Sequence, residues 1–294
     1  MLLFDGSHDK YPISAKEIEE YFYQLEFSGT QKKEDVIYSI AQKIPWTYSI
    51  KEIIDQIEDP TLRAFSRNFM EAINIRRVYH YIAKIKEKDN RSNYIDLEQG
   101  VFLISSIGDP HISYSKVSDK LNSLAEKVME LFELNKLILS DDVKIHLLSR
   151  VLHQEEGFNG NKEDYQNPNN SYLSYVLKSK LGIPLSLSVL YLLVGLRLKL
   201  PLYGANFPLH FMLFYETPKF KSFIDPFHGG VLVERNTCAK FLEANGFSDV
   251  PEKFIKPSTT TILKRMVTNL INIYKNQENH DKENIFLKLL EILR

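Results

Sequence analysis

The sequence contains very little cysteine. Cys238 is the only one among 294 residues, so the chain can form neither an internal disulfide nor a cysteine-rich zinc site. A single thiol in a chain of this size is typical of a reducing compartment, and we expect a cytoplasmic protein. The segment Met1–Lys10 also lacks the basic and apolar regions of a secretory signal.

Two further absences narrow the possible functions. Lys and Arg number 37 against 38 Asp and Glu, a formal net charge of -1, so there is no basic surplus for binding nucleic acid. The most apolar stretch, Leu185–Leu198, has 14 residues and is interrupted by Ser186, Ser188 and Arg197. A membrane span needs about 18 apolar residues, so this stretch predicts a buried helix. We therefore expect neither a nucleic-acid partner nor a membrane.

Hydrophobic residues are plentiful, at 44% of the chain, and their spacing predicts a helix-rich α+β fold. Helical periodicity from Ser14 to Phe27 and from Ser49 to Ile85 predicts an N-terminal helical layer. The polar stretch Lys86–Asn93 has no large apolar residue and is a natural boundary. We expect an N-terminal region over residues 1–93, a core over 94–250 and a helix pair over 251–294.

The expected core mixes helices with strands. Helices are predicted at Leu97–Ile107, Ser115–Phe132, Asp141–Glu155, Ser171–Lys180 and Glu234–Asn245. A long loop, Gly157–Asn170, separates two of them and is long enough to be a functional element. Strands are predicted where short aromatic-rich runs are bounded by proline, at Pro201–Phe207, His210–Tyr215 and Lys221–Ile224.

Two of these strands place a histidine opposite a carboxylate. If Thr217-Pro218 is the centre of the turn, residues whose numbers sum to 435 face each other, and His210 pairs with Asp225. A carboxylate there can orient an imidazole and fix its tautomer, as in a nucleophilic triad. The same pair can instead be a purely structural hydrogen bond. The pattern supplies no nucleophile.

Six motifs follow one another from about Leu97 to the C-terminus. They are Glu163–Tyr165 with Asn167-Pro168, Asn170–Leu173, Gly182–Tyr191, Asn206–Pro208 with His210-Phe211, Phe223–Phe227 with Gly229-Gly230, and Leu263–Met266 with Asn269-Leu270. In their order and spacing the chain resembles the transglutaminase-like superfamily, in its bacterial SirB-type branch with a C-terminal tetratricopeptide-like tail.

The resemblance implies a papain-like core, in which a central helix packs on a small antiparallel sheet and His and Asp lie on adjacent strands. In active members a Gly-x-Cys motif begins that helix, and its cysteine is the nucleophile. Here the motif reads Gly182-Ile183-Pro184, so the nucleophile position holds a proline. The superfamily's His and Asp positions correspond to His210 and Asp225. The resemblance therefore implies that two of three catalytic positions are retained.

Other residues could stand in for the missing cysteine. Ser186 lies about 200° around the helix axis from Pro184, which favours packing or capping over catalysis. Cys238 lies midway along a predicted helix, which favours a buried and inert thiol.

His146 and His153 are seven residues apart, whereas a zinc-binding helix usually pairs i with i+4. We therefore expect no metal and no other cofactor.

The candidate binding residues are Asn206 and Tyr165, which belong to these motifs, and His228, which lies between Phe227 and Gly229. His228 stands where the family more usually has asparagine, and it can be a second polar group of the site or a residue of a glycine-rich turn. The helix pair from Leu263 to Arg294 is one unit that cannot bury both of its faces, so we expect it to pack on the core.

Two functions remain open at this stage. The first is a non-catalytic protein that binds a protein or peptide, because the nucleophile position is Pro184. The second is a hydrolase or acyltransferase in which His210 and Asp225 activate Ser186 or a water. Membership of a superfamily predicts the architecture and leaves the activity undecided.

Overall fold

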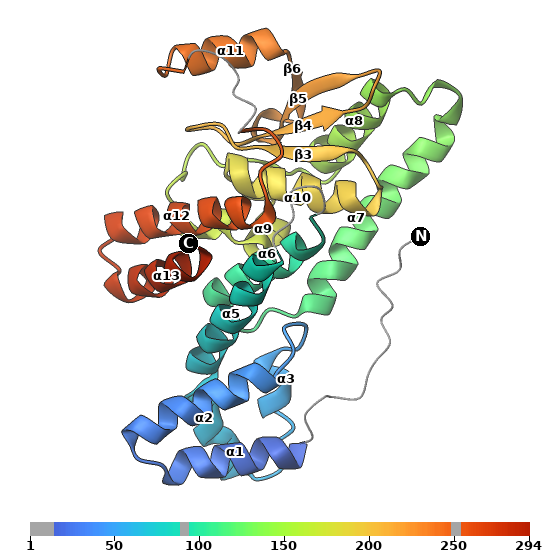
Figure 1. Ribbon diagram of the computed structural model, residues 1–294. Helices are drawn as coiled ribbons and strands as arrows, with labels where there is room; N and C mark the ends of the chain where they lie inside the picture. The colour runs from blue at the N-terminus through green and yellow to red at the C-terminus, as the bar shows by residue number, and fades with distance from the viewer. Residues whose placement is uncertain (1–14, 89–93, 248–253) are drawn as a thin grey trace.

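A computed structural model describes residues 15–88, 94–247 and 254–294 and shows a helix-rich molecule with a small sheet toward one end (Figure 1). The predicted α+β class and the central helix packed on an antiparallel sheet are confirmed. Both expected domain boundaries, after residues 93 and 250, lie outside the described residues. Among the described helices, none combines the length and apolar character needed to cross a membrane.

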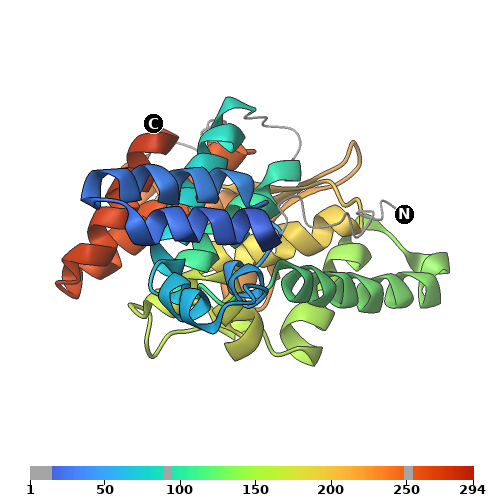
Figure 2. The same ribbon diagram turned by 90° about the horizontal axis from the view of Figure 1, so that it is seen from below.

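The N-terminal helices have a hydrophobic core of their own. They are α1 (Ala15–Phe27), α2 (Thr30–Lys43), α3 (Ile50–Ile54), α4 (Pro60–Arg67) and the start of α5 (Met70–Glu87). From below, α1 and α2 lie side by side across this end of the molecule (Figure 2). Helix α5 connects this core to the rest, because Ile73 belongs to it, whereas Val78 and Ile82 belong to the main core.

Two features of this region were not predicted. Helix α2 was missed because its first turns, from Thr30 to Asp35, are polar and carry no apolar stripe. The helical periodicity expected from Ser49 to Ile85 corresponds to three helices, α3, α4 and α5, whose boundaries were not predicted. Asp59 begins α4 as an N-cap, with its carboxylate accepting the N–H groups of Thr61 and Leu62, and Pro60 follows at the first helical position.

The main core surrounds a helix that is buried along most of its length. Helix α10 (Pro184–Arg197) is buried from Pro184 to Gly195, as its apolar composition predicts. Other helices that contribute to the same core are α6 (Leu97–Gly108), α7 (Tyr114–Leu134), α8 (Asp141–Ser149) with the π-helical continuation η3 (Arg150–Glu155), and α9 (Leu173–Ser179). The short 3-10 segments beside them in the chain are η1 (Tyr94–Asp96), η2 (Lys136–Ile138) and η4 (Pro168–Ser171). Within the predicted loop, β1 (Asn159–Gly160) pairs in parallel with β2 (Leu181–Gly182).

A four-stranded antiparallel sheet lies between α10 and α11 (Arg235–Glu243) (Figure 1). Its strands, in the order β3-β4-β5-β6, are β3 (Leu202–Ala205), β4 (Met212–Glu216), β5 (Lys221–Asp225) and β6 (Val231–Val233). Leu213 belongs to the main core with α10, whereas Met212 and Phe214 pack with Cys238 of α11. This alternation buries both faces of the sheet. Strand β6 was not predicted.

The turn between β4 and β5 corrects the predicted register. The ladder pairs Glu216 with Lys221 and Leu213 with Ile224, two residues away from the expected pairing. The turn has four residues, 217–220, and is closed by the N–H of Thr217, which donates to the carbonyl of Phe220 (2.8 Å). Since side chains alternate with period two, a shift of two residues leaves each on its expected face.

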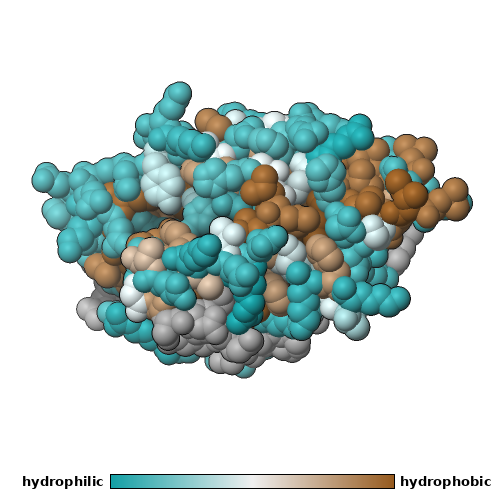
Figure 3. Space-filling view, turned by 90° about the horizontal axis from the view of Figure 1, so that it is seen from above, coloured by the Kyte–Doolittle hydropathy of each residue, from teal (hydrophilic) through white to brown (hydrophobic). Residues whose placement is uncertain are grey.

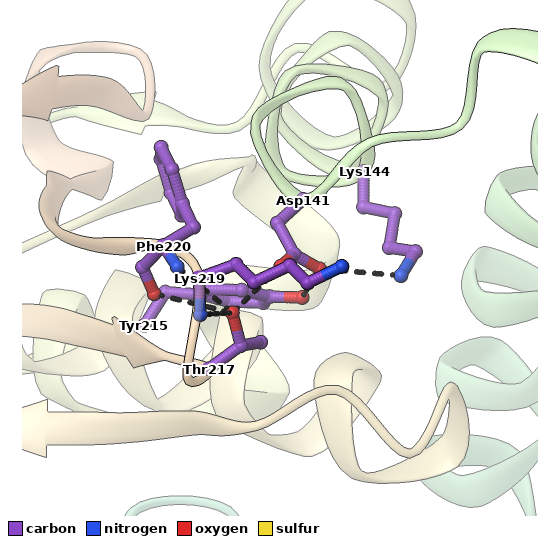
Figure 4. Close-up of polar contacts among 6 residues, drawn as sticks. All are labelled: Asp141, Lys144, Tyr215, Thr217, Lys219 and Phe220. Carbon is purple, nitrogen blue, oxygen red and sulfur yellow. Dashed lines mark hydrogen bonds and ion pairs between the residues drawn. The ribbon is translucent and has the colours of Figure 1, made fainter.

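Asp141, at the start of α8, holds this turn in place (Figure 4). Its carboxylate accepts hydrogen bonds from the hydroxyls of Thr217 (2.7 Å) and Tyr215 (3.0 Å) and lies 3.3 Å from Lys144 Nζ. The Thr217 hydroxyl oxygen accepts the N–H of Phe220 in turn. The Thr217 hydrogen bond is the main cause of the lowered pKa of Asp141, because it favours the charged carboxylate.

The C-terminal helices, α12 (Thr259–Asn276) and α13 (His280–Leu293), pack on the main core as expected. Leu263, Met266 and Phe286 are buried in the same cluster as α10. The hydroxyl of Tyr274 lies 2.9 Å from that of Tyr172, which follows η4. The pair therefore closes one side of the core.

Exposed apolar side chains gather where α7 meets α8. They include Leu134, Leu137, which is 94% exposed, and Ile138. Figure 3 shows brown side chains at the corresponding end of the molecule. The buried residues of α7 end at Phe132, so the segment 134–138 lies beyond the core.

Candidate functional site

The first turn of α10 begins with Pro184, and its one hydroxyl, that of Ser186, is engaged in hydrogen bonds. Ile183 is the N-cap and Pro184 the first helical residue, where a missing N–H is tolerated. The hydroxyl of Ser186 donates to the carbonyl of Asn170 (2.5 Å) and accepts the N–H of Ile183 (3.0 Å). Ser186 is buried, and these bonds give it the capping role that the sequence favoured.

His210 and Asp225 are in contact, as predicted, although by a different route. His210 precedes β4 and is not part of the ladder; its Nε2 lies 2.9 Å from Asp225 Oδ2 at the end of β5. Leu209, just before it, has a φ of +66° and is 70% exposed. A bulky residue rarely adopts this conformation, and such strain concentrates at functional positions.

The carboxylate of Asp225 contacts two imidazoles, those of His210 and His228. Its Oδ1 accepts the N–H of Phe227 at the start of the 3-10 turn η5 (Pro226–His228), which fixes the carboxylate. Its Oδ2 faces His210 Nε2 and also His228 Nδ1, at 2.7 Å. The two imidazole rings stack at 5.8 Å with 27° between their planes. His228 is therefore a member of the polar cluster as well as a turn residue.

The charge of this cluster is set by Asp225. Burial alone would raise the pKa of its carboxyl, but the hydrogen bonds and positive charge of His210, and then those of His228, outweigh burial and lower the pKa. An ionised carboxylate accepts hydrogen bonds and donates none. It therefore favours a proton on Nε2 of His210, the ring nitrogen that faces Asp225 Oδ2.

A short series of contacts connects the start of α10 with this cluster. Gly182, two residues before Pro184, pairs with Gly160 across β1 and β2. A Cβ at Gly160 would lie 2.6 Å from the ring of Phe227, so that ring packs directly on the backbone of β1. Phe227 in turn meets His210 edge-on, with 6.2 Å between ring centroids. The start of α10 and the histidine cluster are thus connected through Gly160 and the ring of Phe227.

The loop after η5 packs against the end of α8 and its π-helical continuation η3. Gly229 and Gly230 have φ of +80° and +73°, which only glycine adopts readily. A Cβ at Gly229 would lie 2.8 Å from His153 Nε2, and the hydroxyl of Ser149 donates to the carbonyl of Gly230 (3.0 Å). His153 therefore supports the turn that carries His228. His146, its partner in the sequence pattern, is exposed on α8.

Cys238, the one cysteine of the chain, is unsuited to nucleophilic chemistry. Cys238 is buried in α11 among Phe214 and Phe223. Burial, and then the negative charge of Asp225, raise the pKa of its thiol to about 11. At neutral pH the thiol is protonated, and the thiolate is the reactive form.

The other candidate binding residues lie beside the cluster. Tyr165 is exposed, and its ring meets Phe227 edge-on at 6.2 Å. Asn206 Oδ1 accepts a hydrogen bond from Arg265 Nη1 (3.4 Å). Burial lowers the pKa of Arg265, while Tyr165 opposes that shift. The region within reach of Tyr165 thus includes a partly buried guanidinium.

Two residues of this region had no role assigned from the sequence. Arg265 and Phe227 both lie within motifs that carried the resemblance, which was the available signal for them. Their proximity depends on how α12 and η5 pack, and a motif read along the chain does not contain that information. The binding roles of Asn206, Tyr165 and His228 remain predictions.

A family model described as the transglutaminase-like superfamily matches residues 115–268. The chain belongs to this superfamily. The matched segment begins in α7, includes α10, the whole sheet and the histidine cluster, and ends within α12. No solved structure gives a significant match to the chain.

Several curated relatives of this transglutaminase-like chain are bacterial proteins named UPF0162. One from Xylella fastidiosa is 32% identical over 146 residues, 48% of this chain and 52% of the relative. One from Haemophilus influenzae is 27% identical over 191 residues, 63% of this chain and 69% of the relative. Human F-box only protein 21 is 30% identical over 169 residues, 55% of this chain and 26% of the relative. The chain spans about half the length of the Xylella protein.

Proposed function

We propose that this transglutaminase-like protein is a non-catalytic, cytoplasmic member of the SirB-type branch, with a tetratricopeptide-like tail, that binds a protein or peptide segment beside the histidine cluster. The observation that carries the proposal is Pro184 at the first position of α10. A proline there has neither a thiol nor a hydroxyl. The covalent step that a cysteine would perform is therefore missing.

The other possible nucleophiles do not replace it. The hydroxyl of Ser186 is engaged by the carbonyl of Asn170 and the N–H of Ile183. The thiol of Cys238 is buried and protonated at neutral pH. Acylation of either residue would require breaking a helix cap or opening the core under α11. Both arguments favour binding over covalent catalysis.

The rim around the cluster has the composition of a peptide-binding surface. Tyr165 and Leu209 are exposed large side chains beside the cluster, and aromatic anchors are common at binding hot spots. Arg265 is partly buried, and no carboxylate within the described residues pairs with it. Guanidinium groups bind carboxylates strongly. A segment with an acidic side chain or a C-terminal carboxylate fits this rim best.

A phage-displayed library of random peptides provides a direct test. Selected peptides are titrated by fluorescence anisotropy against the wild type and against Tyr165→Ala and Arg265→Gln. We expect each substitution to weaken binding at least about tenfold, the effect of losing a hot-spot contact. Leu137→Ala, at the distant apolar tip, is the matched control and should bind as the wild type does.

Two results would overturn the proposal. One is a set of selected peptides whose binding is unaffected by both rim substitutions. The other is turnover by the wild type, either hydrolysis of a peptide or transfer of its acyl group to an amine, that disappears in His210→Ala while the melting temperature is kept. That second result would establish the hydrolase or acyltransferase alternative, in which turnover depends on His210 and Asp225.

A further inference from the structure

We propose that His210, Asp225 and His228 bind a divalent transition-metal ion. This goes beyond the binding of a peptide, because it assigns a ligand to the centre of the cluster instead of its rim. Sequence spacing had pointed away from a metal, since it drew attention to His146 and His153 on one helix. In the folded chain the three candidate ligands come from different segments: His210 precedes β4, Asp225 ends β5 and His228 ends the turn η5.

The donor atoms already lie close to coordination geometry. One donor atom each from His210, Asp225 and His228 fall within 4.8 Å of one another. Asp225 Oδ2 is 2.9 Å from His210 Nε2 and 2.7 Å from His228 Nδ1. Around a tetrahedral zinc ion with bonds of about 2.0 Å, neighbouring donor atoms are about 3.3 Å apart. Small rotations of the side chains would therefore admit an ion.

The carboxylate is held ready for this role. Asp225 Oδ1 is occupied by the N–H of Phe227, so Oδ2 is the oxygen directed at both imidazoles. Phe227 also meets His210 edge-on, and it rests on Gly160, which limits how far either group can rotate. Such surrounding contacts orient metal ligands and raise affinity.

The donor set indicates which ions fit. Two imidazole nitrogens and one carboxylate oxygen suit zinc, iron, cobalt or nickel better than magnesium or calcium, which prefer oxygen ligands alone. Three protein ligands leave a coordination position for water. The side chain of His228 is 49% exposed and that of His210 is 20% exposed, so an ion can reach the cluster from solvent.

The test uses the full chain without an affinity tag, stripped with EDTA and titrated with Zn²⁺ against a chromophoric chelator. We expect one zinc ion per chain, with affinity reduced at least about 100-fold in His228→Asn and in Asp225→Asn. His228 lies at the surface, and circular dichroism checks that its variant is folded. Co²⁺ should give the visible absorption of a tetrahedral site in the wild type and lose it in both variants.

Two histidine variants outside the cluster serve as controls. His146 is exposed on α8 and His280 is exposed at the start of α13, so the controls are His146→Gln and His280→Gln. Both should keep one zinc ion at wild-type affinity. Absence of zinc binding by the wild type, or binding that His228→Asn leaves unchanged, would overturn the proposal. No peptide is present, so this outcome is independent of the proposed peptide binding.

Discussion

The start of α10 and the end of β5 border the same region but differ in chemistry. At the start of α10, the polar group is a serine hydroxyl whose bonds cap a helix, and the neighbouring residue is Pro184. At the end of β5, one carboxylate joins two imidazoles. The comparison teaches that the helix start can hold a proline and a capping serine while the end of the neighbouring strand holds a carboxylate shared by two imidazoles.

The largest expected effect comes from Asp225. Asp225→Ala removes an acceptor for the N–H of Phe227 and for both histidines, and leaves these donors unpaired in a largely buried site. We expect a loss of about 3 kcal/mol in the free energy of unfolding, measured by urea denaturation with EDTA present. Asp119→Ala, an exposed aspartate of α7, should change it by less than about 0.5 kcal/mol. Equal effects of the two would contradict the role given to Asp225.

A smaller effect is expected at the start of α10. Ser186→Ala removes a helix cap and the hydrogen bond to Asn170, and should cost about 1 kcal/mol. Ser188→Ala is a matched control in the same helix, because the buried hydroxyl of Ser188 has no hydrogen-bond partner among the described residues. That variant should be neutral or slightly stabilised. If both variants lost the same free energy, the hydroxyl of Ser186 would have no special role.

Acid should weaken the cluster by less than the deletion of its carboxylate. The pKa of Asp225 is lowered in the folded chain, so its contribution to stability is present above the unfolded pKa and is lost as pH falls through the folded pKa. The difference in unfolding free energy between the wild type and Asp225→Asn should therefore shrink from about pH 5 to about pH 3. A difference that stays constant over this range would show that the charge of Asp225 contributes nothing.

Local patterns predicted much of the fold, because helical spacing and proline-bounded strands depend on near neighbours in sequence. The register of β4 and β5 was wrong by two residues because Asp141, far away in sequence, binds Thr217 and helps set the length of the turn. Similarly, the contact of His210 with Asp225 was predicted from strand pairing, although His210 lies outside the strand. The contact forms nonetheless, because His210 lies just before β4 and Asp225 lies at the end of β5, the neighbouring strand.

The role of His228 illustrates what local reasoning leaves out. Its position beside two glycines is typical of a turn, and the turn is there. That the same turn directs Nδ1 of His228 at the oxygen already facing His210 depends on Asp225 capping η5. The carboxylate of Asp225 both caps η5 and contacts the two imidazoles, and the sequence alone does not show that one side chain has both roles.

The most direct measurement is the reactivity of a thiol placed at the start of α10. Pro184→Cys is alkylated with iodoacetamide over a range of pH, with EDTA present, and peptide mapping separates the introduced thiol from slow-reacting Cys238. If the two regions form one site, His210 should lower the pKa of that thiol below about 7.5, and adding His210→Gln should return it to about 8.5. A thiol pKa that is the same with and without His210 would contradict a shared site.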